Sequence, residues 1–73
     1  MTTPRSNRGR AARAGGVLES YAGGAGDDEA SLTDLMTDIR HWCRISGVGF
    51  ERATISSQRH FAAELAEERR DET

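Results

Sequence analysis

Three residues in the second half of the chain carry side chains that zinc prefers as ligands. His41, Cys43 and His60 offer two imidazoles and one thiol, and these donor types make up many zinc sites. Positions two residues apart on an α-helix diverge by about 200°, so His41 and Cys43 cannot face one ion. We interpret Cys43 as a small packing residue and His60 as cover for the core edge. The sequence predicts no metal site.

A second group with possible chemistry is the acidic run after His60. Glu64, Glu67 and Glu68 belong to a residue type that binds Mg²⁺ or iron in helical-bundle enzymes. Such sites draw ligands from several facing helices, and the preceding helix presents only an apolar stripe. Gly47-Val-Gly49 and the glycine-rich run at 23–29 lack the context of a nucleotide-binding loop. Ser56 and Ser57 lack the context of a catalytic nucleophile. The sequence therefore predicts a non-enzymatic protein without catalytic residues or cofactor.

Nucleic-acid binding is the third chemistry the residues raise. The net charge is −2, yet the first 16 residues hold four arginines and no acid. Residues 47–61 resemble the turn and recognition helix of helix-turn-helix repressors, whose polar side chains meet phosphates and bases. The preceding helix is too long for that motif, and the negative charge of residues 17–73 opposes DNA. The candidate nucleic-acid residues are Arg5, Arg8, Arg10, Arg13, Thr54, Gln58 and Arg59.

The composition limits what can position these residues. The chain has 73 residues, of which 36% are hydrophobic and 30% charged, so it forms at most one small domain with a marginal core. A single cysteine excludes an intrachain disulfide framework. Residues 1–30 contain one small apolar cluster, 17–21, between glycine-rich stretches. We predict a disordered basic arm and linker over 1–30, with 17–21 either packing as one helical turn, the favoured interpretation, or serving as a binding motif.

Two amphipathic helices are predicted in the remainder. Ser31 is the expected N-cap of the first, which should end near Arg44 or Ile45 with Gly47 as its C-terminal cap. Its apolar residues share one stripe, with spacings typical of a helix: Leu32, Leu35, Met36, Ile39, Trp42 and Cys43. The second helix should begin between Gly49 and Glu51 and end near Arg69, before a polar tail at 70–73. One of its apolar faces contains Phe50, Ala53, Ser57, Phe61 and Leu65.

The second helix also carries an additional apolar strip. Ile55, Ala62 and Ala66 lie about 120° from its first face, with Arg59 beside them. An all-α antiparallel hairpin over 31–69 would bury only one side of each helix, so we predict that two hairpins pair into a dimeric four-helix bundle. The alternative is a third helix at 17–25 covering a monomer. The predicted partner-binding residues are Ile55, Arg59, Ala62 and Ala66.

A family resemblance rests on residues 34–65. The pattern resembles one in small uncharacterised proteins of phages, plasmids and bacterial genomes, which implies an α-hairpin and no assigned activity. Ser57 departs from the apolar residue that the pattern has there. The matching residues are Asp34, Asp38, Arg40, His41, Trp42, Cys43, Gly47, Phe50, Ala53, His60, Phe61 and Glu64.

The functional prediction combines these features. We expect an accessory or protein-interaction module, phage- or plasmid-type by resemblance, that acts through a helix face or the arginine arm. A small nucleic-acid-binding regulator is the alternative. No apolar run reaches the ~18 residues that span a bilayer, and no secretory segment is evident at the N-terminus, so a cytoplasmic homodimer without membrane contact is expected.

Overall fold

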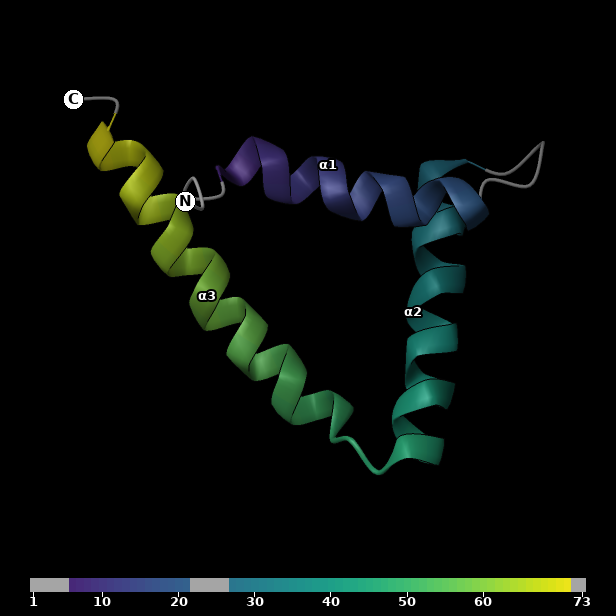
Figure 1. Cartoon of the computed structure of the whole chain (residues 1–73). Helices are drawn as coiled ribbons and strands as arrows, with labels where there is room; N and C mark the ends of the chain where they lie inside the picture. Colours follow the sequence, from purple (N-terminus) through teal and green to yellow (C-terminus); the bar gives the residue numbers. More distant parts are fainter. Residues whose placement is uncertain (1–5, 22–26, 72–73) are drawn as a thin grey trace, which may run out of the picture.

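The protein is built of helices arranged as an open triangle. The computed structural model describes residues 6–21 and 27–71. Within these ranges it contains α1 (Asn7–Leu18), a 3₁₀ turn η1 (Glu19–Tyr21), α2 (Asp28–Ser46) and α3 (Phe50–Asp71), with no strand. Figure 1 shows α1 bridging the far ends of α2 and α3, which meet at the 47–49 turn. The all-α prediction is confirmed.

Helix α1 corrects the prediction of disorder before Ser31. Asn7–Leu18 is helical, and the Ser6 hydroxyl caps it by accepting from the Gly9 N–H at 3.0 Å. Alanine and arginine are among the strongest helix formers, and they make up much of this segment. The proposed third helix at 17–25 is misplaced, because α1 ends at Leu18 and η1 at Tyr21. Residues 1–5 and 22–26 of the predicted arm lie outside the described residues.

Helix α2 confirms one predicted cap and corrects the other. Asp27, rather than Ser31, is the N-cap, and its carboxylate accepts from the Ala30 N–H at 2.7 Å. Ser31 instead lies inside the helix and is buried. Gly47 caps the C-terminus in the left-handed conformation (φ 76°, ψ 19°), as the sequence predicted. The Val48 N–H donates to the Cys43 carbonyl at 3.0 Å across this turn.

Helix α3 begins where the sequence predicted and runs slightly further. It starts at Phe50 and ends at Asp71, so the first two residues of the predicted polar tail belong to the helix. The other two lie outside the described residues. The Ala53 N–H donates to the Gly49 carbonyl at 3.1 Å, which places Gly49 at the helix start.

The two long helices do not pack as an antiparallel hairpin. From the turn they diverge, and α1 separates their far ends (Figure 1). A helix of 12 residues is about 18 Å long, which exceeds the 8–10 Å between packed helix axes. The single-chain hairpin prediction is therefore wrong, and the physical reason is the helix that the sequence reading missed. A dimeric bundle remains a prediction.

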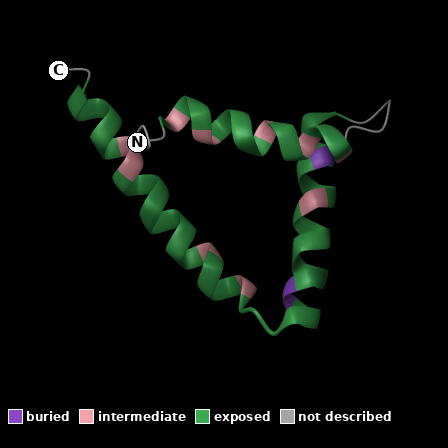
Figure 2. Ribbon diagram, viewed as in Figure 1, coloured by how far each residue is buried: buried purple, intermediate pink, exposed green. Residues whose placement is uncertain are grey.

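The open arrangement leaves very little core. Of the described residues only Ser31 and Cys43 are buried, and Figure 2 shows exposed surface along all three helices. The radius of gyration is 14.9 Å, whereas a compact chain of this length has about 11 Å. Large apolar side chains therefore remain accessible.

Candidate functional site

The first junction of the triangle joins α1 to α3 through polar groups. The Asn7 amide donates to the Glu64 carbonyl and to a Glu68 carboxylate oxygen, both at 3.1 Å. Arg10 Nε lies 3.3 Å from Glu64 Oε2, and Arg10 Nη1 donates to Asn7 Oδ1 at 2.8 Å. The Arg10 and Glu64 side chains are 39% and 32% exposed, so this ion pair contributes at most about 1 kcal/mol.

A hollow of about 420 Å³ lies at this junction. Phe61 and Leu65 form its apolar part, and Ala11 faces them from α1. Around them lie the polar side chains of Asn7, Arg10, Glu64 and Glu68. The two glutamates already hold α1 in place, so their role in the described structure is to join helices.

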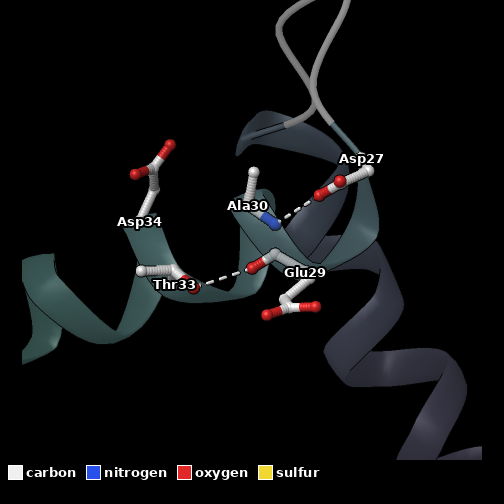
Figure 3. A pocket seen from close by; sticks show the side chains of 5 residues that line it. All are labelled: Asp27, Glu29, Ala30, Thr33 and Asp34. Atoms are coloured by element: carbon white, nitrogen blue, oxygen red, sulfur yellow. Dashed lines mark hydrogen bonds between the residues drawn. The ribbon is translucent and has the colours of Figure 1, made fainter.

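A second hollow, of about 400 Å³, lies at the start of α2. Figure 3 shows its lining residues. Asp27 is occupied by its bond to the Ala30 N–H, and the Thr33 hydroxyl donates to the Glu29 carbonyl at 2.8 Å. Asp34 points away from these two bonds (Figure 3). Acids at this end stabilise the helix, because the N-terminus of a helix dipole is positive.

The second junction joins η1 to α2. The buried Ser31 hydroxyl donates to the Tyr21 carbonyl at 3.3 Å. The pKa of the Tyr21 phenol is raised above its ordinary value of 10.0, mainly by a hydrogen bond to the Asp38 carboxylate and further by burial and the charges of Asp38 and Asp34. The segment 17–21, predicted to pack as a helical turn, thus contacts α2 through Tyr21.

This pKa shift predicts a dependence on alkaline pH. A raised pKa means that the folded chain favours the neutral phenol, so the stability that comes with this shift is fully present below pH 10.0 and is lost as the pH rises through the raised value. Asp38→Ala should lower the pKa of Tyr21 toward 10.0, measured by phenolate absorbance. Asp34→Ala removes only a weaker charge effect and should lower it less. Equal shifts in the two variants would contradict the hydrogen bond.

The third junction is the turn between α2 and α3. The Arg40 guanidinium carbon lies 4.2 Å from the centroid of the Phe50 ring, and Arg40 Nη1 lies 3.8 Å from Glu51 Oε1. Such a cation–π contact contributes about 0.5–1 kcal/mol at an exposed position. Cys43 is buried in this part of α2, which agrees with its predicted packing role.

The predicted partner-binding residues occupy one strip of α3. Ile55, Arg59, Ala62 and Ala66 follow at positions i, i+4, i+7 and i+11, and all four are exposed. Ile55 is 52% exposed. We call these four residues the α3 strip. The structure places all four on an accessible surface.

The predicted nucleic-acid residues are spread over two helices. Arg8 and Arg13 are exposed on α1, and Arg10 is engaged by Glu64. The Thr54 hydroxyl donates to the Phe50 carbonyl at 3.0 Å, so it is occupied within α3. Gln58 and Arg59 are exposed on α3, and Arg5 lies outside the described residues. These side chains do not form one continuous basic surface on a single helix.

The residues that join the ends of the three helices were only partly predictable from the sequence. The Asn7 amide bonds to α3 and the Ser31 hydroxyl bonds to the Tyr21 carbonyl. Packing of segment 17–21 was predicted, but these contacts of Asn7 and Ser31 were not. A usable signal was Ser6 before an alanine–arginine run, which is typical of a capped helix. Pairing across more than 50 residues left no signal in the pattern.

Among residues 6–21 and 27–71, no group of three or more His, Cys, Asp or Glu side chains could hold a metal ion. Within the same ranges, no helix is long and apolar enough to cross a membrane.

Comparison with known proteins adds no relative to this picture. No protein-family model matches the sequence, and neither a curated protein nor a solved structure shows significant similarity to the chain.

Proposed function

We propose that the protein is a non-enzymatic interaction module whose α3 strip binds another protein. The observation that carries this proposal is the near absence of a core. Among the described residues, only one apolar side chain, Cys43, is buried, whereas Ile55 of the strip is 52% exposed and Phe61, on another face of α3, is 65% exposed. Exposed apolar surface on this scale marks an interaction site.

The α3 strip has the pattern of a helix that docks into a groove. Spacings of i, i+4, i+7 and i+11 place four side chains on one line of the helix, and such anchors are typical of helix-in-groove recognition. Ala62 and Ala66 are small, so a partner can approach the helix backbone closely. Ile55 provides the large apolar contact, and Arg59 adds a charged group at the edge.

The engaged carboxylates support a binding role over a catalytic one. Glu64 and Glu68 hold α1 on α3, and Asp27 caps α2. Carboxylates held in this way stabilise the helices and their arrangement. Large apolar side chains remain exposed beside these carboxylates, among them Ile55 on α3 and Trp42 on α2.

The test compares two neighbouring substitutions on α3. Ile55→Glu places a charge in the strip, and Ser56→Glu places the same charge about 100° away on the same exposed helix. Tagged full-length chains are used to capture proteins from the producing cells, and a captured protein is purified and titrated against both variants. We expect Ile55→Glu to weaken this binding at least about 100-fold and Ser56→Glu to leave it unchanged. Equal binding by both variants would contradict the proposal.

Nucleic-acid binding is the second candidate, favoured by the exposed Arg8 and Arg13 on a helix without acids. Binding to random duplex DNA that weakens steeply with salt would support it, and no binding at low salt would exclude it.

A further inference from the structure

The largest exposed apolar surface lies on α2 rather than on the α3 strip. Leu32, Met36, Ile39 and Trp42 recur at helical spacing, and each is at least 38% exposed. Leu35 lies among them and is half-buried. We call these five residues the α2 stripe. It runs from Leu32 to Trp42 in a helix of 19 residues and is about 15 Å long.

The accessible area of the chain indicates how much surface remains to be covered. The 8.0 kDa chain exposes 6541 Å², whereas a compact monomer of that mass exposes about 4,500 Å². The difference is about 2,000 Å². A standard interface needs about 800 Å² from each partner, and the excess, summed over the whole chain, is larger than that area.

Helix α1 of the same chain leaves the α2 stripe exposed. Asn7 and Arg10 hold one end of α1 on α3, while Tyr21 at the other end contacts α2 through Ser31. These contacts keep the far ends of α2 and α3 apart (Figure 1). Closing the hairpin over the stripe would require both sets of contacts to break.

The charge pattern of α2 is complementary to itself in the antiparallel direction. Its first half carries Asp28, Glu29 and Asp34, and its second half carries Arg40 and Arg44 with one acid, Asp38. The first half is therefore net negative and the second half net positive. Two copies of α2 packed antiparallel would bring each acidic half near the arginines of the other copy. The two helix dipoles would also oppose each other, which is favourable. A parallel arrangement would place like charges together.

We infer that the α2 stripe is covered by a second copy of this chain, through a two-fold antiparallel contact of α2 with α2 centred near Met36 and Ile39. The inference extends the proposed function, because it assigns the α2 stripe to the homodimer and leaves the α3 strip free for a different protein. A two-fold contact uses the same surface on both copies. Each substitution in the stripe therefore acts twice.

The test measures the mass of the full chain by sedimentation equilibrium over a range of concentrations. We expect a dimer for the unchanged chain. Met36→Glu should raise the dimer dissociation constant at least about 100-fold, because both copies lose an apolar contact and gain a buried charge. Thr37→Glu is the matched control: it adds the same charge one residue away, off the stripe, and should leave the dimer intact. Circular dichroism verifies the helices, and Leu32→Gln replaces Met36→Glu if that variant unfolds.

Three outcomes would overturn the inference. One is a monomeric mass for the unchanged chain at all concentrations. In that case α3 or another protein, rather than a second copy, would cover the stripe. Another is a dimer that tolerates both Met36→Glu and Leu32→Gln. The third is a dimer lost in Ile55→Glu and kept in Met36→Glu, which would assign self-association to the α3 strip. Loss of partner capture in Ile55→Glu with an intact dimer would leave both proposals standing, so the two can fail separately.

Discussion

Replacing Cys43 with aspartate should destabilise the protein by at least about 3 kcal/mol, because an unpaired charge would be placed in one of the few buried positions. The thiol is 5% exposed. A chain of this size has a free energy of unfolding of only about 4–11 kcal/mol, so the substitution would remove from about a quarter to about three quarters of it. Urea denaturation followed by circular dichroism, at one fixed chain concentration, measures the effect.

The control for this prediction is two residues away on the same helix. His41 is exposed, and His41→Asp introduces the same side chain where water can solvate it. Its effect should stay within about 0.5 kcal/mol. If the two variants unfold at the same urea concentration, Cys43 does not occupy a buried position and the turn between α2 and α3 is packed differently.

Gly47→Ala is expected to cost about 1–2 kcal/mol, because Gly47 has φ 76° and a Cβ is strained in the left-handed region. No neighbouring atom lies within 4 Å of the position a Cβ would take. The cost is therefore conformational rather than steric. Thermal and urea unfolding of the full chain both report it.

Gly49→Ala is the matched variant, since it makes the same change on the other side of Val48. Gly47 is the one glycine with positive φ in the described residues. A Cβ on Gly49 would make an ordinary 3.5 Å contact with Arg52. Its effect should remain below about 0.5 kcal/mol. A cost for Gly49→Ala equal to that for Gly47→Ala would contradict the left-handed cap.

The helices with strong periodicity were predictable from the sequence. The apolar spacing within 32–43 predicted α2, and Gly47 predicted its end and the start of α3 within a few residues. Both signals depend only on residues that are close together in the sequence. The predicted N-cap of α2 lies four residues after the observed one. Ser31 suits an N-cap by type, but Asp27 takes that role, and the buried Ser31 bonds to Tyr21 instead.

The missing helix had a different cause. Residues 7–16 contain no large apolar side chain, which favours a prediction of disorder, and α1 indeed has no buried residue. It is held by Asn7 and Arg10, whose partners Glu64 and Glu68 are more than 50 positions away. Single-sequence patterns do not reveal such polar pairs. The divergence of α2 and α3 was missed for the same reason, since it depends on α1.

The junction of Asn7 and Arg10 with α3 has a mechanical consequence. Three helices joined to one another at three junctions keep their relative angles. When one junction is released, the helices can rotate about the other two. The angle between α2 and α3 at the 47–49 turn therefore depends on the bonds that Asn7 and Arg10 make with α3 at the other end of that helix. Weakening those bonds would change the direction in which the α3 strip points without altering any residue of the strip.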